Sequence, residues 1–352
     1  MTGYLARRLR YSIFVLLGVV TFIFFLFNVL PADPARLTMG QRSDMASVAN
    51  ARKALNLDKP MLTRYLLYLN DISPLSINGR DSATRQEYPY FSLLPVSRSN
   101  ALALKWPHLG RSYRTRKEVS AILADALPGT ALLAVVAMSF ATLLGILLGV
   151  LAALKKNTWV DTSAIAASVA GISMPSFFAG LLIAYLFGYL LHNYTGLNMT
   201  GSLWEYDPFT GRHLALKNLI LPAFALGIRP LAIITQLTRS ALLDTLSQDY
   251  IRTAYAKGLS RTRTLFRHAL PNALNPVITA VSGWLAELLA GSFFVEYIFG
   301  WKGIGKVTVD ALDKFDFPLV MGAVLLTSVI FIIINLLTDL LYAWIDPRVR
   351  LY

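Results

Sequence analysis

The chain has 352 residues, of which 55% are hydrophobic and 15% are charged, with a formal net charge of +13. Soluble domains carry about a quarter charged residues. The composition therefore excludes an ordinary soluble protein, and the excess of Lys and Arg is typical of the cytoplasmic loops of a membrane protein rather than of a nucleic-acid-binding surface. The absence of cysteine excludes disulfides and thiolate metal sites, and the four histidines are too far apart in the sequence to indicate another metal site.

The chain contains six candidate transmembrane helices. Crossing a bilayer takes about 20 mainly apolar helical residues. The stretches that meet this length are Tyr11–Leu30, Ala131–Leu154, Ala164–Leu191, Leu219–Leu237, Pro276–Phe299 and Leu319–Trp344. The first follows the basic sequence RRLR, as a secretory signal peptide would, but its apolar run is longer than that of a signal. We therefore expect it to be retained as the first membrane helix.

Basic residues gather in the loops on one side of these spans. They are Arg7, Arg8, Arg10, Lys155, Lys156, the segment Arg239–Arg267, Arg348 and Arg350. Because Lys and Arg in short loops mark the cytoplasm, both termini are predicted to be inside, with an outer loop over residues 31–126. Within that loop, Leu62, Leu66 and Leu69 recur at helical spacing, whereas SPLSINGRDSATRQEYPYFSLLPVSRSN is typical of an irregular loop.

The segment FGWKGIGKVT, residues 299–308, comes close to a phosphate-binding loop. The pattern G-x-x-x-x-G-K-[ST] requires a hydroxyl that binds Mg²⁺, and Val307 stands in that position. The segment also follows a predicted span instead of a strand, lies on the outer side, and is not followed by a helical period. We therefore expect a glycine-rich turn with Lys302 and Lys306 in solvent, and a chain that does not itself hydrolyse ATP.

The cytoplasmic segment SQDYIRTAYAKGLSRTRTLFRHALPNALNP, residues 247–276, predicts two short helices around a glycine. Asp249 is expected to cap the first helix, Lys257 to lie at its C-terminal end, and Gly258 to take the left-handed conformation that ends it. Ser260 is expected to cap the second helix. Leu265, Phe266 and Ala269 are expected to share one face of that helix, and Pro271 is expected to end it. An ordinary basic loop is the alternative interpretation.

The same loop resembles the EAA motif of ABC importer permease subunits, E-A-A-x₃-G-x₉-I-x-L-P. The positions that fit in register are Ala254, Gly258, Leu270 and Pro271, and those that depart are Arg252, Thr253 and His268. The string QDYIRTAYAKGLS…RHALPNALNPV is similar to the variant in dipeptide, oligopeptide and nickel permeases. Similar strings run along nearly the whole chain, among them YLARRLRYSIFVLLGVVTFIFFLFNVLPADPA, ISMPSFFAGLLI, FFVEYIFGWKGIGK and DLLYAWIDPRVR.

This resemblance implies an all-α integral membrane protein of the bacterial inner membrane. Its fold would be the type I ABC importer transmembrane domain, with six transmembrane helices, both termini inside, and a large outer loop after the first helix. Residues 1–30 would form the N-terminus and first helix, 31–126 the outer loop, 127–345 the core, with a coupling loop at 244–271, and 346–352 the cytoplasmic tail.

The resemblance also implies partners: a second homologous permease subunit, expected to form a heterodimer, two ABC ATPase subunits that bind ATP and Mg²⁺, and an extracytoplasmic substrate-binding protein. The chain itself would be no enzyme and would bind no cofactor or metal. Its coupling loop would contact the ATPase, with Ile251, Ala254 and Tyr255 packing into a cleft of that partner. The residues expected to act in this loop are Asp249, Tyr250, Ile251, Arg252, Ala254, Tyr255, Lys257, Gly258, Leu270 and Pro271.

Polar residues inside the predicted spans are candidates for the substrate pathway, because a charge in lipid is costly and usually functional. These candidates are Arg229, Glu287 and Asn335; pairing of the charges within the helix bundle is the alternative. Small peptides are the expected substrates, with nickel chelates or oligosaccharides as alternatives. An ion-coupled secondary transporter is the alternative function, although such a protein would normally show repeat-related halves.

Overall fold

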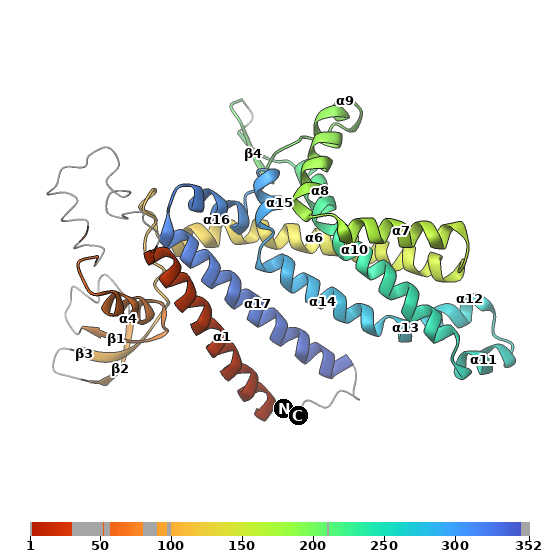
Figure 1. Ribbon diagram of the computed structural model, residues 1–352, viewed down its shortest axis with the longest axis horizontal. Coiled ribbons are helices and arrows are strands. Elements are labelled where there is room, and N and C mark those ends of the chain that lie inside the picture. Colours follow the sequence, from red (N-terminus) through yellow and green to blue (C-terminus); the bar gives the residue numbers. More distant parts are fainter. Residues whose placement is uncertain are drawn as a thin grey trace. The chain divides into compact units, whose positions relative to one another are not determined.

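The computed structural model describes residues 2–29, 52, 57–79, 90–96, 100–209 and 211–345. The chain divides into two compact units. The core unit comprises Met1–Arg8, Ala126–Val309 and Val329–Tyr352, and the N-terminal unit comprises Leu9–Asp125 and Asp310–Ser328. The described part of the chain is mostly helical (Figure 1).

Four single helices are long and apolar enough to cross a membrane. They are α1 (Thr2–Val29), α6 (Val119–Leu154), α10 (Lys217–Leu246) and α17 (Phe317–Ile345). Two bent pairs also pass as composites. One joins α7 (Trp159–Ser173) to α8 (Ser176–Ile183) and the π-helix η1 (Ala184–Leu190), and the other joins Arg261–Ala273 to α14 (Asn275–Ala290). The described residues therefore contain four candidate spans, or up to six if each bent pair counts as one.

The predicted third span, Ala164–Leu191, is not a straight helix. Its two halves meet at an angle of 107° (Figure 1). Met174 is extended, with ψ of 124°, because a residue that precedes a proline is disfavoured in the helical conformation. Pro175 follows it and begins the next helix.

The predicted fifth span, Pro276–Phe299, ends early. Helix α14 stops at Ala290, and Gly291 has φ of +133°, which breaks the helix. A separate helix, α15 (Phe293–Ile298), follows, so the run SFFVEYIF is helical as expected and is not a strand.

In the core unit, glycines let α6 lie directly against α10. A Cβ atom on Gly145 would come within 2.8 Å of Ile234, and one on Gly149 within 2.6 Å of Thr238. Small residues permit this close helix contact in membranes, where van der Waals packing replaces the hydrophobic effect. The core around this contact is apolar; its fully buried members include Leu133, Ile234, Val277, Val295, Phe299 and Trp301.

The N-terminal unit contains a small sheet where an irregular loop was expected. Strands β1 (Leu75–Gly79), β2 (Tyr90–Pro95) and β3 (Asn100–Lys105) form an antiparallel sheet in the order β1-β3-β2. The prediction for residues 73–100 was wrong because a composition rich in Ser, Asn, Pro and Arg conceals a short stretch of alternating residues, LSING, that has the period of a strand. Most of β3, ALALK, lies beyond that segment.

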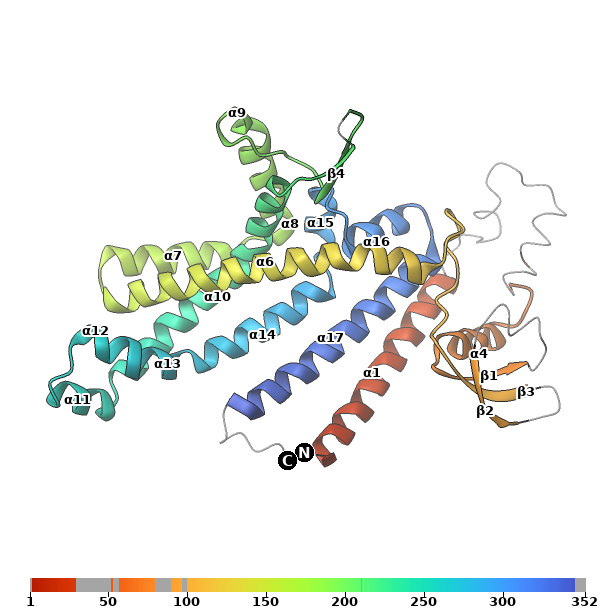
Figure 2. The ribbon, with the colours of Figure 1, turned by 180° about the vertical axis from the view of Figure 1, so that it is seen from behind.

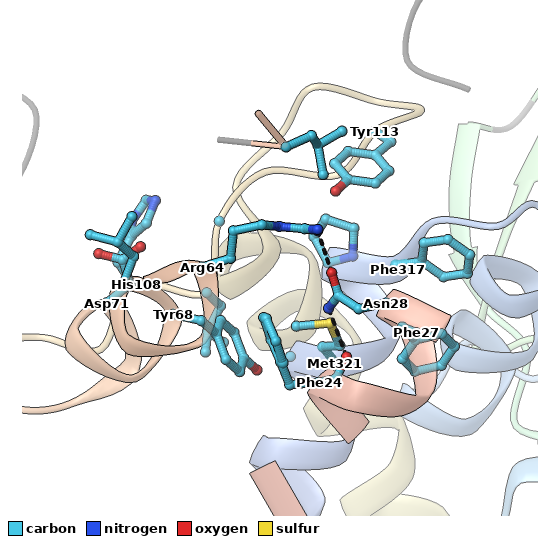
Figure 3. Close-up of a pocket in the computed structure, with 16 residues that line it drawn as sticks. Phe24, Phe27, Asn28, Arg64, Tyr68, Asp71, His108, Tyr113, Phe317 and Met321 are labelled. Atoms are coloured by element: carbon cyan, nitrogen blue, oxygen red, sulfur yellow. Dashed lines mark hydrogen bonds between the residues drawn. The ribbon is translucent and has the colours of Figure 1, made fainter. Parts of the chain in front are cut away.

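Helix α4 (Met61–Ile72) confirms the helix expected from the spacing of Leu62, Leu66 and Leu69, and it packs against α1. The Tyr65 hydroxyl lies 2.6 Å from the Thr21 hydroxyl, and the centres of the Phe24 and Tyr68 rings are 5.6 Å apart. Arg64 donates a hydrogen bond to the side-chain oxygen of Asn28 (Figure 3). These contacts attach α4 to the first helix.

The remaining elements are short. They are α9 (His192–Thr195), strands β4 (Trp204–Asp207) and β5 (Gly211–Leu214), which form a hairpin, and α16 (Ile304–Asp313). The expected all-α class is therefore corrected: the chain is mainly helical, with two small sheets outside its apolar spans.

Candidate functional site

The predicted coupling loop lies at the end of α10. Helix α11 (Asp249–Ala256) follows α10 almost directly, and α12 (Arg261–Thr264), the π-helix η2 (Leu265–Ala269) and α13 (Leu270–Ala273) lead on to α14 (Figure 2). Gly258 has φ of +81°, as predicted. Ser260 caps the second helix by accepting a hydrogen bond from the Arg263 backbone N–H.

Two local predictions in this loop were wrong. Gln248, rather than Asp249, is the residue that flanks the start of α11, and Asp249 is its first helical residue. Pro271 does not end the second helix; it lies in the first turn of α13, where a proline costs little because its missing N–H has no helical partner to lose.

One side of α11 is buried in the chain's own core. Ile251 is fully buried and Ala254 is 6% exposed. Ile251 belongs to an apolar cluster whose other members come from α6, α10, η2 and α13, and they are Ala153, Leu242, Leu265, Ala269 and Ala273. The expectation that Ile251 and Ala254 fill a cleft in a partner is therefore wrong. Both are apolar residues within one turn of an amphipathic helix, and this chain already supplies the surface that buries them.

Other residues of the loop are exposed, and they are aromatic or basic. Tyr250 and Tyr255 are 44% and 43% exposed, and Phe266, expected to share the buried face of Leu265, is 61% exposed. Arg252 and Lys257 are also exposed, and the Arg252 guanidinium lies 3.4 Å from the Asp249 carboxylate. Exposed aromatic and arginine side chains are the residue types enriched in protein interfaces. We define these exposed residues, Tyr250, Arg252, Tyr255, Lys257 and Phe266, as the candidate coupling surface.

A nearly buried ion pair connects α10, the helix that precedes this loop, to α7. Asp161, in the first turn of α7, is 3% exposed, and both of its carboxylate oxygens accept hydrogen bonds from Arg239 of α10. Asp161 also accepts a bond of 3.0 Å from the backbone N–H of Asn157, which closes the turn between α6 and α7. The pair joins α7 to α10, and the Asn157 bond connects it to the turn that follows α6. The sequence analysis missed it because its members are far apart in the chain.

The structure does not bring the predicted pathway residues into one cluster. The Arg229 guanidinium lies over the Trp284 ring at 5.5 Å from its centre, whereas Glu287 is exposed on α14. The Asn335 side chain donates a bond of 2.8 Å to the Phe331 carbonyl of its own helix. For these described residues, no ion pair between Arg229 and Glu287 is observed.

The glycine-rich segment at residues 299–308 uses its N–H groups to bind a carboxylate of the chain itself. Glu296 is fully buried, and one of its oxygens accepts bonds from the backbone N–H groups of Gly305 and Lys306 at 2.7 and 3.2 Å. Its other oxygen accepts from the hydroxyls of Thr130 and Ser292 at 2.8 and 3.1 Å. Burial raises the pKa of Glu296, and these four donors partly offset that effect.

The expectation that no helix follows this segment was wrong, since α16 begins at Ile304. Its first N–H groups are the kind that bind phosphate in nucleotide-binding loops. Here Glu296 takes that position, and a Cβ atom on Gly303 would lie only 2.3 Å from its carboxylate. Lys302 is exposed as expected, whereas Lys306 is half-buried. The segment is a capped helix start rather than a nucleotide site.

The N-terminal unit has a cavity of about 210 Å³ between α1, α4 and the start of α17 (Figure 3). Phe24, Tyr68 and Met321 form apolar walls, with Arg64 and Tyr113 nearby. Burial raises the pKa of Tyr113 to about 12, so this hydroxyl stays protonated. No group of three or more His, Asp or Glu suited to a metal occurs within the described ranges.

Two family profiles together match most of the chain. The inner membrane component of binding-protein-dependent transport systems matches residues 145–351, and the N-terminal region of such membrane components matches residues 1–134. The chain belongs to this family. It is an ABC importer permease of the inner membrane, a transport component rather than an enzyme.

Several curated proteins resemble the chain over most of its length. The di/tripeptide transport system permease DppB of Pseudomonas aeruginosa is 36% identical over 99% of both chains, and the dipeptide permease DppB of Escherichia coli K12 is 35% identical over 99% of both. A solved structure of the MetNI methionine ABC transporter has a TM-score of 0.50 at 16% identity, over 64% of this chain and 97% of that one. This last likeness concerns the fold alone.

Proposed function

We propose that this permease forms half of the membrane pathway of an ATP-driven importer of short peptides. Six spans, with both bent pairs crossing the membrane, and cytoplasmic termini form the proposed topology. A contact between the first and last spans supports it. The Arg8 guanidinium of α1 lies 2.5 Å from the Asp339 carboxylate of α17, so these two helix ends belong on the same side of the membrane. The relatives' names, which specify dipeptides and di/tripeptides, support the substrate class.

The candidate coupling surface docks into an ATPase subunit in this proposal. Two such subunits would bind ATP and Mg²⁺, a second and different permease would complete the pathway, and a substrate-binding protein would deliver the peptide. The observation that carries the proposal is that α11 buries some of its side chains within this chain and exposes others. Its Ile251 and Ala254 side is held by the permease, which leaves Tyr255 and Arg252 to engage a partner.

Packing of α11 explains how movement of the ATPase would reach the spans. Ile251 lies in one apolar cluster with Leu242 of α10 and Ala153 of α6. Asp161 and Arg239 add a bidentate connection from α10 to α7. Closely packed interiors transmit displacement because they are not readily compressed. A displacement of α11 should therefore move three helices as one body.

Within the pathway, Arg229 and Glu287 are proposed to contact the substrate. A short peptide carries a carboxylate and an ammonium group, which are complementary to an arginine and a glutamate respectively. Their exposure in the single chain supports this role, since neither charge is neutralised by the other. Asn335 is the proposed third polar residue of this pathway.

Cysteine crosslinking in the assembled transporter tests the coupling surface, because the native chain contains no cysteine. Tyr255→Cys should crosslink to a cysteine placed in the docking groove of the ATPase subunit. Ala254→Cys, the adjacent buried position, should not. Efficient crosslinking at Ala254 with none at Tyr255 would show that the Ala254 side of α11 contacts the ATPase subunit. The assignment of the coupling surface would then be wrong.

A further inference from the structure

A groove of about 320 Å³ lies between α6, α7 and α10 in the core unit (Figure 2). Large apolar side chains form its walls: Leu148 and Leu151 of α6, Trp159 of α7, and Ile228 and Leu231 of α10. None of the described residues that line the groove is charged. The groove therefore presents a mainly apolar surface to an occupant.

The groove forms because one face of α7 carries small side chains. These residues recur at helical spacing, and they are Ser163, Ala164, Ala167, Ser168 and Gly171. The face approaches α10 closely at Gly171, where a Cβ atom would lie 3.3 Å from the side chains of Ala232 and Ile228. Nearer the start of α7, the small side chains leave the space between the surrounding leucines unfilled.

The groove has the length of one lipid leaflet. Arg239 of α10 pairs with Asp161, in the same helical turn as Trp159, and Ile228 lines the other end beside Gly171. From Ile228 to Arg239, α10 rises about 16 Å at 1.5 Å per residue. Half of a hydrocarbon core is about 15 Å thick. An acyl chain that enters beside Trp159 would therefore reach Gly171 near the middle of the bilayer.

Two lysines lie at the mouth of this groove. Lys155 and Lys156 are in the turn between Leu151 of α6 and Trp159 of α7, and both are exposed. Asp161, the acidic residue closest to them in the sequence, already bonds to an arginine of α10. The mouth therefore carries positive charge directly beside the apolar groove.

We propose that this groove binds an acyl chain of an anionic phospholipid, with the lipid phosphate against Lys155 and Lys156. Basic residues at the cytoplasmic ends of membrane helices attract anionic headgroups. Trp159, which is 79% exposed, is a residue type enriched at the boundary between headgroups and hydrocarbon. The choice of the cytoplasmic leaflet rests on the proposed topology, whereas the pairing of charge and groove does not.

Two features favour a lipid over other occupants. A transported peptide carries charged termini, and no charged side chain among the described lining residues would pair with them. A partner protein that covered the mouth would have to pair both lysines, because an unpaired buried charge is costly. An anionic lipid satisfies the lysines and the apolar walls with one molecule.

Photolabelling in nanodiscs tests the proposal. The assembled transporter is placed in phosphatidylcholine, and phosphatidylglycerol with a diazirine at the end of an acyl chain is titrated in. Crosslinked peptides are mapped by mass spectrometry. Crosslinks should concentrate near Gly171 and Ile228, at the inner end of the groove. The same diazirine carried by phosphatidylcholine should label these positions far less.

Charge variants separate this site from general attraction to the membrane. Lys155→Gln combined with Lys156→Gln should weaken phosphatidylglycerol labelling about 30-fold, since each lysine near the surface contributes about 1 kcal/mol. Arg261→Gln combined with Arg263→Gln removes the same charge from exposed positions of α12 and should leave the labelling unchanged.

A second pair of variants tests the groove itself. Ala167→Leu places a larger side chain in the groove and should abolish labelling near Gly171. Ala166→Leu adds the same atoms at an exposed neighbouring position outside the lining, and should not.

Two other outcomes would overturn the proposal. Equal labelling by both lipids, unchanged by the lysine substitutions, would show an unselective lipid surface. Absence of crosslinks near Gly171 and Ile228 would show that another protein surface, such as the second permease, covers the groove. The diazirine lipid reaches both leaflets and the readout requires no peptide transport. Failure here would therefore leave the proposed function intact, and an inverted topology would leave the labelling intact.

Discussion

Gly258 shows how a single backbone angle can be predicted from local sequence. Its φ of +81° follows the last turn of α11, in the position where helices commonly end with a left-handed glycine. No atom lies within 4 Å of a Cβ built on it, so the constraint there is conformational and not steric. The burial of Ile251 and Ala254 could not be predicted from local sequence in the same way, because the surface that buries them comes from distant segments.

Substitution of Gly258 should therefore depend on backbone preference alone. Gly258→Val should destabilise the loop by about 1–2 kcal/mol, the cost of the left-handed region for a residue with a Cβ, and should lower ATP-coupled peptide uptake. Gly258→Asn should retain most uptake, because asparagine tolerates this conformation. Equal uptake by both variants would mean that the turn does not constrain coupling.

At the scale of elements, the clearest difference from prediction is α16, which begins where the sequence predicts a glycine-rich turn with no helix after it. Ile304, Val307 and Ala311 do have helical spacing, but the glycines before them favoured a turn. The group that stabilises this helix start is Glu296, a buried carboxylate from α15. An acidic residue shortly before a glycine-rich helix start was the available signal, since a carboxylate stabilises the N-terminal end of a helix.

The crowding around Glu296 gives a prediction about two glycines. Gly303→Ala should destabilise the purified chain by about 2 kcal/mol, because the new methyl group would overlap the Glu296 carboxylate. Gly283→Ala, in α14, meets no atom within 4 Å and should be neutral or stabilising by up to about 1 kcal/mol. Thermal unfolding in detergent measures both. Equal midpoints would show that the Glu296 network does not hold this helix start.

At the scale of the whole molecule, the distribution of Lys and Arg gives a prediction of orientation. In the proposed topology Lys302 is outside and Lys156 is in the cytoplasm. Lys302→Cys should react with a membrane-impermeant thiol reagent added to intact cells, and Lys156→Cys should react only after the membrane is opened. Both lysines are exposed, so burial should not prevent either reaction. The reverse pattern would invert the topology.

The sequence by itself determined the properties that depend on composition and local spacing. These are the membrane class, the approximate positions of the apolar helices, the turn at Gly258 and the family resemblance. Tertiary structure decided what depends on contacts between distant residues: the inward side of α11, the Asp161–Arg239 pair, the Glu296 cap and the burial of Ser76 and Asn78 in β1. The physical reason is that burial and hydrogen bonding are properties of pairs of surfaces. The alternating pattern of LSING identifies two faces, but only the tertiary structure shows that Ser76 and Asn78 are buried while Leu75 and Ile77 are exposed.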